Sequence, residues 1–455
     1  MFRRILIANR GEIAARIARA CREMGIESVA VHSTADAGSP HLAAADRTIC
    51  IGPPPAERSY LDMDAVLQAA EQTECQAIHP GYGFLAENAL FAARCDAQRI
   101  TFIGPSARLM RLMGDKLEAR KTMRSAGIRV IPGSDGPVND AADAARAADE
   151  VGYPVFLKAT AGGGGRGIRL CGSEADLKRA FPEAAAEAGK AFGNPLLYIE
   201  KAIVGARHIE FQILADAWGD AVHLGERECS VQRRHQKLVE ESPSPAVSEA
   251  ERRSVGGQVA AAIARLGYRN AGTVEFLRGR DGALYFMEMN TRLQVEHPVT
   301  EAVTGIDIVQ EQIRIAANEP LRRVQADVAT SGHAIECRIN AEDPDDGFRP
   351  CPGTLTRFEI PAGVRVETHI TPAAAAAGYR VPPYYDSLLA KLIAYGPDRG
   401  TAIATAAKAL AAFHIEGITT TLSVHRRILE HPAFLAGDYD LDFMDTLTAP
   451  AARRS

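Results

Sequence analysis

Lysine is scarce in this chain, since only nine of its 52 basic residues are lysine and nearly every positive charge is an arginine. A lysine that is retained indicates a site that requires a compact ammonium group rather than a planar guanidinium. The formal net charge of −5 gives no basic field that would attract nucleic acid or an anionic membrane surface. We therefore expect no nucleic-acid partner and no membrane association.

Long apolar runs and paired cysteines are missing as well. No segment approaches the roughly 18 uninterrupted apolar residues of a membrane-spanning helix, and a strand pattern begins at Arg3, which leaves no room for a removable leader. The eight cysteines stand at irregular spacings without a CxxC pair, which argues against a zinc site and a disulfide framework. We expect a protein of the cytoplasm whose thiols are reduced.

The apolar patterns divide the chain into three parts and a tail. Residues 3–32 read as strand, helix and strand, and with a further strand at 100–104 they predict a doubly wound α/β domain over residues 1–113. Two helical patterns, around residues 106–113 and 115–126, lead into residues 114–203, where strands at 154–159 and 196–201 predict a small α+β module. Residues 204–446 are rich in strand-like runs and close with a helix at 401–412, followed by a tail at 447–455. The predicted fold class is therefore α/β and α+β.

A glycine-rich run, AGGGGRGIR at 161–169, lies between two predicted strands. Such a run loses much conformational entropy on folding, but it exposes a row of amides that can close over phosphate groups. Lys158 stands three residues before the run and can add a cation to the same anion. No GK[ST] follows, so this is not a Walker loop. The alternative is a flexible hairpin or linker.

Polar and apolar residues alternate strictly over residues 288–296, EMNTRLQVE. In a strand this alternation places five polar side chains on one face and four apolar ones on the other. The polar face would carry Glu288, Asn290, Arg292, Gln294 and Glu296. The alternative is a strand face that is simply solvated.

A hairpin upstream of this alternation brings a second carboxylate to it. The strands TVEFL and LYFMEM flank RGRDGA, where Asp281-Gly282 is a favoured two-residue turn. If that turn is tight, Arg280 pairs with Ala283 and Glu275 lies opposite Glu288. Opposed like charges destabilise a sheet unless something neutralises them, and carboxylates with an amide oxygen are ligands suited to Mg²⁺ that also bridges phosphates.

A basic run, SVQRRHQK at 230–237, precedes the acidic pair Glu240-Glu241. Such a run is more often a solvated surface than a site, although its Lys237 is one of the few retained lysines.

Taken together, these segments resemble biotin carboxylase, a member of the ATP-grasp superfamily. The matching runs occur in family order from residue 3 to about 445. They are IANRGEIA (7–14), HPGYGFLAEN (79–88), LMGDK (112–116), GGGGRG (162–167), RRHQK (233–237), EMNTRLQVEHPVTE (288–301), ECRINAEDP (336–344) and VPPYYDSLLAKL (381–392). The stretch TPAAAAA at 371–377 departs from the family, where this region is usually shorter.

The resemblance implies an N-terminal α/β domain, an ATP-grasp linker and mobile lid at 114–203, and an ATP-grasp and C-terminal domain at 204–446, with ATP held between lid and C-terminal domain. Glu275, Glu288 and Asn290 would hold Mg²⁺ or Mn²⁺. By the same analogy, the residues expected around ATP are Lys116, Lys158, Gly163, Gly164, Gly165, Gly167, Glu200, Lys201, Ile203, His208, Gln232, His235, Glu275, Leu277 and Glu288.

The resemblance also implies the chemistry. Glu296 would deprotonate bicarbonate, held by Lys237, Arg292, Gln294 and the Val295 backbone, for attack on the γ-phosphate of ATP. The carboxyphosphate formed would break down to CO₂ and phosphate, and Arg338 would stabilise the ureido oxyanion of biotin. Tyr82 and Gly83 would contact the biotin rings. The expected catalytic residues are thus Lys237, Arg292, Glu296 and Arg338.

None of the nine lysines stands in the methionine-flanked setting of a biotin acceptor, so we expect biotin on a separate carrier protein, with carboxyltransferase subunits as further partners. The family implies a homodimer and, as the default acyl acceptor, acetyl-CoA of fatty acid biosynthesis, with propionyl- and methylcrotonyl-CoA next. Two other functions stay open: an ATP-grasp ligase that passes its acyl phosphate to an amine, and a silent nucleotide-binding subunit that regulates a partner.

Overall fold

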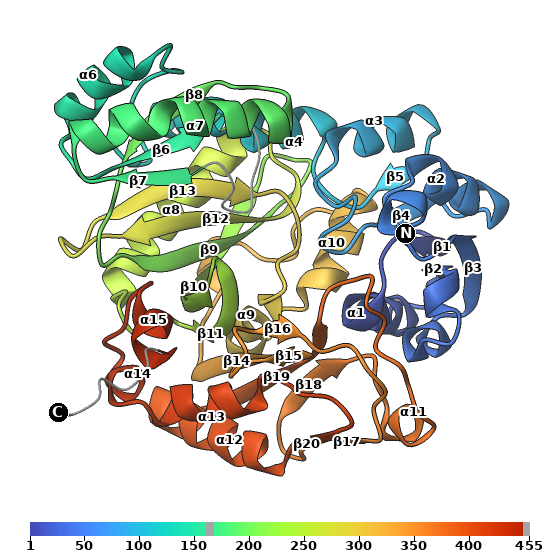
Figure 1. Cartoon of the computed structure of the whole chain (residues 1–455). Helices are drawn as coiled ribbons and strands as arrows, with labels where there is room; N and C mark the ends of the chain where they lie inside the picture. Colours follow the sequence, from blue (N-terminus) through green and yellow to red (C-terminus); the bar gives the residue numbers. More distant parts are fainter. Residues whose placement is uncertain (161–167, 449–455) are drawn as a thin grey trace.

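The computed structural model describes residues 1–160 and 168–448 (Figure 1). Its N-terminal part is a five-stranded parallel sheet in the order β3-β2-β1-β4-β5, with helices on both faces. This order confirms the predicted doubly wound fold. The elements are β1 (Arg4–Ile7), α1 (Gly11–Glu23), β2 (Glu27–Ser33), β3 (Arg47–Gly52), α2 (Met63–Gln72), β4 (Ala77–His79), α3 (Ala89–Ala97) and β5 (Thr101–Phe102).

After Arg4, strand β1 is apolar because both of its faces are buried. Ile5 and Ile7 pack in one cluster with α1, whereas Leu6 packs in another with α2 and α3. The chain reverses its direction of winding between β1 and β4, so the carboxyl ends of these two strands border a crevice.

Two loops meet at that crevice, one after each strand. The side-chain amide of Asn9 donates to the carbonyls of Pro80 and Tyr82, both at 2.7 Å. Gly81 adopts φ +63°, and a Cβ there would lie 2.9 Å from the Asn9 amide nitrogen, so both backbone conformation and space require glycine. The predicted biotin contacts Tyr82 and Gly83 are therefore held at the sheet's switch point.

A second unit lies at the top of Figure 1 and has its own apolar core. Its antiparallel sheet has the order β7-β6-β8 and is covered by two helices. The preceding segment contains the two predicted helices, α4 (Ala107–Gly114) and α5 (Lys116–Ser125). The unit itself consists of α6 (Ala141–Val151), β6 (Val155–Ala159), β7 (Ile168–Cys171), α7 (Glu174–Phe192) and β8 (Leu197–Lys201).

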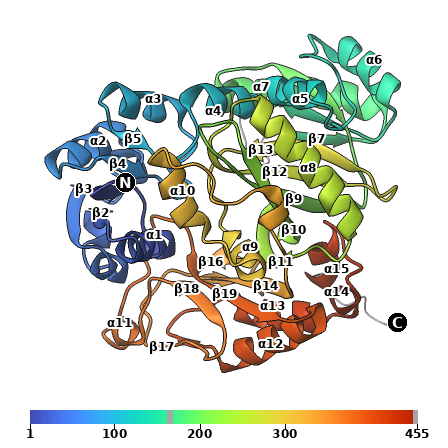
Figure 2. The ribbon, with the colours of Figure 1, turned by 180° about the vertical axis from the view of Figure 1, so that it is seen from behind.

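The remaining chain builds one antiparallel eight-stranded sheet in the order β13-β12-β9-β10-β11-β14-β19-β18. Seen from behind, α8 lies across its β9–β10 part (Figure 2). The strands are β9 (Arg207–Ala215), β10 (Ala221–Arg233), β11 (Gln236–Ser242), β12 (Asn270–Arg278), β13 (Leu284–Asn290), β14 (His333–Asn340), β18 (Arg365–Thr368) and β19 (Leu388–Gly396).

Helices cover both faces of this sheet. At β19, Ile393 packs with α9 and Leu392 packs with α12, because successive residues of a strand face opposite sides. The helices are α8 (Glu249–Arg265), α9 (His297–Thr304), α10 (Ile308–Ala316), α11 (Pro372–Ala376), α12 (Arg399–Ala412), α13 (Leu422–Glu430), α14 (Pro432–Ala436) and α15 (Phe443–Thr448). The small strands β15 (Glu342–Asp343) and β16 (Arg349–Pro350) pair, as do β17 (Arg357–Glu359) and β20 (His414–Glu416).

The alanine-rich stretch at 371–377 forms the single-turn helix α11. Pro372 occupies its start, and the hydroxyl of Thr371 accepts a hydrogen bond from the Ala374 amide. A proline at the first helical position and a threonine cap are the usual signals for a helix start. The departure from the family pattern thus has a local structural explanation.

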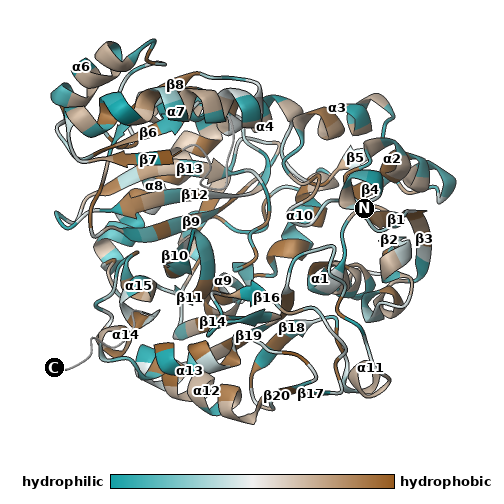
Figure 3. Cartoon of the chain, in the orientation of Figure 1, coloured by the Kyte–Doolittle hydropathy of each residue, from teal (hydrophilic) through white to brown (hydrophobic). Residues whose placement is uncertain are grey.

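Charged side chains reach the interior of the large sheet. In Figure 3 hydrophilic colour follows β10 and β11 through the middle of the molecule. The buried polar residues of these two strands are His223, Glu226, Arg227, Glu228, Ser230, Gln232, Glu240, Glu241 and Ser242. Buried charges are costly unless they are paired, so a cluster of this size marks a region built for something other than packing.

Candidate active site

Glu275 and Glu288 lie directly opposite each other on the paired strands β12 and β13, as predicted. Glu275 is buried, and its Oε1 accepts hydrogen bonds from Asn290 (2.8 Å) and Gln294 (3.0 Å). Glu288 accepts no hydrogen bond from the described part of the chain, and burial, with the charge of Glu275 added, raises its pKa. Beside Glu275, Glu288 therefore presents a carboxylate that no described donor binds, and hard oxygen donors of this kind fit a divalent cation.

The predicted two-residue turn between these strands is wrong, although the register it implied is right. Arg278 pairs with Leu284, and the Gly279 amide donates to the Ala283 carbonyl at 2.9 Å, so three residues form the loop tip. A bulge then adds one residue to β13 between Phe286 and Glu288. The longer loop and the bulge shift the register in opposite directions, and the two shifts cancel.

The predicted strand over 288–296 is also shorter than expected, because β13 ends at Asn290 and α9 begins at His297. The polar side chains of 290–294 nevertheless converge. The Arg292 guanidinium donates to the side-chain oxygens of Asn290 (2.9 Å) and Gln294 (2.8 Å). Side-chain hydrogen bonds therefore bring these polar groups together, whereas we had expected the alternation of a β-strand to do so.

Lys237 lies at the centre of the buried charges. Its Nζ is 2.6 Å from Glu210 Oε2, 3.2 Å from Glu275 Oε1 and 2.5 Å from Glu296 Oε1. Three carboxylates around one ammonium confirm that this lysine is not part of a solvated surface. Burial opposes its charge, but these carboxylates outweigh burial and keep the pKa of Lys237 well above its ordinary value.

Glu296 is 0% exposed and bridges two cations. One oxygen lies near Lys237, and the other accepts a hydrogen bond from Arg338 Nη2 at 2.7 Å. Burial would raise the pKa of Glu296, yet Lys237 and Arg338 lower it below 4.5, so the carboxylate is ionised at neutral pH. Arg338 also binds Glu240 Oε1 at 2.6 Å.

The predicted phosphate-binding lysines lie near Glu288 and Glu200. Lys158, in β6, forms an ion pair with Glu200 of β8. Lys116 is the first residue of α5, and its electrostatic neighbours are Glu288, Lys158 and Glu200; burial is the main cause of its lowered pKa. Lys201 instead donates to the carbonyls of residues 152 and 153, at 2.7 and 2.9 Å.

The other residues predicted near ATP fall into two groups. Within the sheet, His208 Nε2 is 3.2 Å from Glu275 Oε2, Gln232 is 3.3 Å from His208 Nδ1, and Leu277 pairs with His208 across β12 and β9. At its edge, His235 occupies the exposed β10–β11 turn with φ +65°, and Ile203 is half-buried beside the Gly279 loop. The glycines Gly163, Gly164, Gly165 and Gly167 lie outside the described residues.

Sequence reasoning missed three charged residues that hold this site together. Glu87 accepts hydrogen bonds from the Thr291 amide (2.9 Å) and Arg292 Nε (2.8 Å). Glu210 contacts Lys237 and also Arg227, whose guanidinium is fully buried. Glu87 stands inside the run HPGYGFLAEN that carried the family resemblance, and that was the available signal. Glu210 and Arg227 stand in strand runs that gave none.

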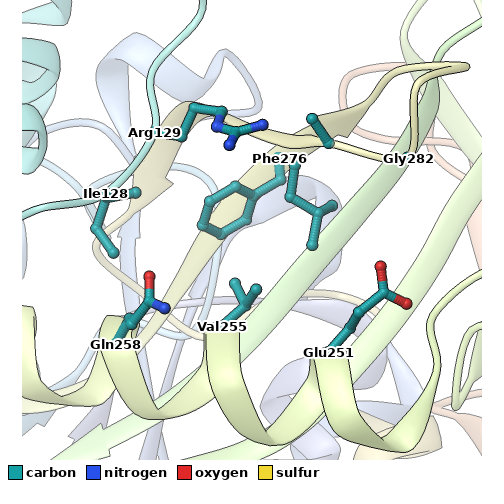
Figure 4. A pocket seen from close by; sticks show the side chains of 9 residues that line it. Ile128, Arg129, Glu251, Val255, Gln258, Phe276 and Gly282 are labelled. Atoms are coloured by element: carbon teal, nitrogen blue, oxygen red, sulfur yellow. The ribbon is translucent and has the colours of Figure 1, made fainter.

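A cavity of about 250 Å³ opens between α8, the β12–β13 loop and residues 128–129 (Figure 4). It lies on the far face of β12 from Glu275, on the side of the core residue Phe276. None of the predicted site residues lines it. The candidate active site is therefore the cluster of charged residues around Lys237 and Glu275, and this cavity is not part of it.

Glu336 lies beside the site on β14, directly opposite Glu240 of β11, and is 0% exposed. No donor in the described residues reaches either of its oxygens, and burial raises its pKa well above 4.5. A group whose folded-state pKa is raised stabilises the fold below about pH 4.5, and that contribution is lost as pH rises through the folded value.

We therefore expect the contribution of Glu336 to stability to fall by up to about 1.4 kcal/mol per pH unit above the ordinary carboxyl pKa, until Glu336 ionises in the folded state. Glu336→Gln lacks this titration, so the difference in Tm between variant and wild type should shift in favour of the variant from pH 5 to pH 9. Thermal unfolding across that range measures it. A difference that does not change with pH would contradict a protonated Glu336.

Among the described residues, no helix is long and apolar enough to cross a membrane.

Comparison with known proteins identifies the family. "Biotin carboxylase, N-terminal domain" matches residues 1–110, "Carbamoyl-phosphate synthase L chain, ATP binding domain" matches residues 115–324, and "Biotin carboxylase C-terminal domain" matches residues 336–446. The biotin carboxylase of Allochromatium vinosum is 53% identical over 450 residues, 98% of this chain and 99% of its own. A pyruvate carboxylase subunit of Methanothermobacter thermautotrophicus is 49% identical over 98% of this chain and 90% of its own.

A solved structure agrees with these relatives. The biotin carboxylase domain dimer of the 2-oxoglutarate carboxylase of Hydrogenobacter thermophilus, in complex with MgADP, ADP and bicarbonate, is 47% identical with a TM-score of 0.93, and 98% of each chain is covered. The chain therefore belongs to the biotin carboxylase family of ATP-dependent carboxylating ligases.

Proposed function

We propose that this chain uses MgATP and bicarbonate to carboxylate biotin that a separate carrier protein supplies. The observation that carries the proposal is the position of Glu296, an ionised and fully buried carboxylate between Lys237 and Arg338 and close to the Glu275–Glu288 pair. A base, two cations and a divalent-metal site within one network fit the activation of a small anion against a phosphate group.

The first step is the attack of bicarbonate on the γ-phosphate. Lys237, Arg292, Gln294 and the Val295 backbone bind the anion, and Glu296 takes its hydroxyl proton. The bicarbonate oxygen forms a bond to phosphorus as the bond to ADP breaks, which gives carboxyphosphate. Glu275, Glu288 and Asn290 would hold a divalent cation, which would neutralise charge on the phosphate oxygens.

The second step transfers the carboxyl group. The carbon–oxygen bond of carboxyphosphate breaks to release CO₂ and phosphate, and the phosphate accepts the N1′ proton of biotin. The nitrogen then bonds to CO₂. Arg338 donates to the developing ureido oxyanion, while Tyr82 and Gly83 contact the biotin rings from the switch point of the N-terminal sheet.

Around the nucleotide, Lys116 and Lys158 bind phosphates; the glycines at 163–165 and 167, which we also expected there, lie outside the described residues. Lys158 is paired with Glu200, and its ammonium has further donors that can bind a phosphate. Lys201 donates to the carbonyls of Gly152 and Tyr153 and so connects two segments of the lid. The remaining contacts proposed for the base and ribose are Glu200, Ile203, His208, Gln232, His235 and Leu277.

Free biotin provides the test. We expect it to accelerate ADP release from MgATP and bicarbonate, with one carboxybiotin formed for each extra ADP. Unchanged turnover with biotin, but faster turnover with an amine, would favour the alternative ligase that forms an amide or carbamate. Failure to hydrolyse ATP under any condition would favour a silent regulatory subunit.

The proposed context is a multisubunit acyl-CoA carboxylase of the cytoplasm. The chain acts as a homodimer with a biotin carboxyl carrier and carboxyltransferase subunits. Acetyl-CoA is the first candidate acceptor, but the acceptor is chosen by the carboxyltransferase. Identity to the pyruvate carboxylase subunit is nearly as high as to the biotin carboxylase, at 49% and 53%. We propose domains at 1–113, 114–203 and 204–446 with a tail at 447–455.

Glu87 gives a prediction for this function, because it holds both the Thr291 amide and Arg292. Glu87→Gln removes its charge and should raise the KM for bicarbonate about tenfold, since a hydrogen bond to a charged group contributes about 1.5 kcal/mol or more. The KM for ATP should change less than about twofold. Steady-state kinetics measures both constants, with the exposed Glu74→Gln as control. An unchanged KM for bicarbonate would contradict the positioning role.

A further inference from the structure

Lys391 is a fully buried lysine without a role in the proposed mechanism. It lies in β19, is 0% exposed, and belongs to the run VPPYYDSLLAKL. In a chain with nine lysines among 52 basic residues, burying one of them requires an explanation.

The Lys391 ammonium makes two direct contacts. Its Nζ is 2.9 Å from Glu12 Oε1, and it donates to the Val295 carbonyl oxygen, also at 2.9 Å. The Tyr82 ring centroid lies 5.8 Å from the same nitrogen, and the Tyr82 hydroxyl donates to Glu12 Oε1. One ammonium thus links the segment before Glu296 to the loop at the N-terminal switch point.

Val295 needs such a donor because residues 291–296 form neither strand nor helix. Buried backbone carbonyls outside regular structure must find partners elsewhere. His297 Nδ1 is hydrogen-bonded to the Gln294 carbonyl oxygen at 2.8 Å, and Lys391 donates to the Val295 carbonyl oxygen. The Val295 carbonyl belongs to the peptide group that joins Val295 to Glu296. By binding this carbonyl, Lys391 fixes the orientation of that peptide group and so the position of the Glu296 backbone.

The charges around Lys391 come from every neighbouring element. In register with it stand Arg338 on β14 and Glu367 on β18, Glu12 comes from α1, and Glu336 and His297 are further electrostatic neighbours. The carboxylates compensate its burial. Its two contacts require a compact donor that can bind a carboxylate and a carbonyl together, which fits an ammonium.

We propose that Lys391 is a positioning residue of the carboxylation reaction, which fixes the Val295–Glu296 peptide on one side and, through Glu12, the Tyr82 hydroxyl on the other. The inference rests on the proposed function, because Val295 and Tyr82 are the proposed bicarbonate and biotin contacts. The Lys391 ammonium thus fixes the position of the bicarbonate contact relative to the biotin contact.

The test compares Lys391→Met with the double variant Glu12→Gln/Lys391→Met. The single variant leaves a buried carboxylate without its cation and should lower Tm. The double variant removes both charges and should recover most of that Tm, while the new side-chain amide oxygen can still accept from the Tyr82 hydroxyl. Val295 nevertheless loses its donor, so the KM for bicarbonate in biotin-free ATP turnover should rise about tenfold in the double variant.

Two further readouts complete the experiment. The KM for free biotin in the double variant should rise about threefold or more, because the amide that replaces the Glu12 carboxylate has no ammonium to anchor it, and the KM for ATP should stay within about twofold of wild type. Lys408→Met, an exposed lysine of α12, is the control and should change none of these constants.

The outcomes separate the two hypotheses. Wild-type turnover that free biotin does not stimulate would overturn the proposed function. Normal stimulation together with wild-type KM values for bicarbonate and biotin in a folded double variant would overturn the role of Lys391 alone and leave it a structural ion pair. A KM for ATP raised as much as that for bicarbonate would also overturn it, since the effect would then be global.

Discussion

Glu296→Gln is expected to lower kcat about a thousandfold while leaving nucleotide binding intact, which is the range that removal of a general base produces. Glutamine keeps the shape of the side chain and one acceptor oxygen, but it cannot take the bicarbonate proton. ADP release with saturating bicarbonate measures kcat, and the Tm shift caused by MgADP measures binding. A variant with more than about a tenth of wild-type kcat would contradict Glu296 as the base.

The network around Glu296 predicts that this variant folds. After the change Lys237 keeps Glu210 and Glu275, and Arg338 keeps Glu240. The matched control is Glu226→Gln, since Glu226 is equally buried in the same sheet and is paired with Arg252 at 2.6 Å, outside the site. The control should lose stability but keep kcat, so a lost activity in Glu296→Gln cannot be attributed to a weakened sheet.

The N-terminal fold was predictable because its signals are local. The short apolar strand from Arg4, the helix that follows and the stop at Gly25 all lie within one βαβ unit, and both faces of β1 are buried. The opposition of Glu275 and Glu288 was predictable for a similar reason, since a hairpin connects neighbouring segments. Its loop was not, because a three-residue tip and a bulge give the same register as a tight turn.

The carboxylate partners of Lys237 could not be derived from the residue pattern alone. Glu210, Glu275 and Glu296 stand 27, 38 and 59 residues from it. Their meeting depends on strand order, with β9 between β12 and β10, and on an irregular segment after β13. Periodicity describes one element at a time, whereas this cluster results from several elements. The same holds for Glu12 and Glu87, which the N-terminal domain contributes to a site on the large sheet.

The two kinds of site residue differ in how they are held. Glu275, Lys237 and Arg338 stand on β12, β11 and β14 of one hydrogen-bonded sheet, so their backbones are fixed. Arg292, Gln294 and Glu296 stand on an irregular segment, where Glu87, His297 and Lys391 supply the missing backbone and side-chain partners. Substitutions of the strand residues should mainly lower kcat. Substitutions of the supporting residues should mainly raise the KM for bicarbonate.

Glu288→Gln is expected to lower kcat/KM for MgATP about a hundredfold, because stabilisation of phosphate charge by a metal ion contributes several kcal/mol. Glu288 lies opposite Glu275, but only Glu275 is bonded to Lys237, Asn290 and Gln294 within the described part of the chain. Glu288 thus carries the carboxylate that none of these three groups binds, and removing its charge weakens the attraction of the pair for a cation. Asp281→Asn, on the exposed loop of the same hairpin, is the control.

Metal titration distinguishes this cause from a general loss of activity. The concentration of Mg²⁺ that gives half-maximal ATP turnover should rise at least tenfold in Glu288→Gln, and higher Mg²⁺ should restore part of the rate. ADP alone should stabilise variant and wild type equally in the presence of a chelator, whereas the same concentration of Mg²⁺ should add more stability to wild type than to the variant. An unchanged Mg²⁺ dependence in a folded variant would show that the cation binds elsewhere. Because Glu275 and Glu288 face one another only through the register of β12 and β13, the carboxylation chemistry would then need a metal site that this hairpin does not provide.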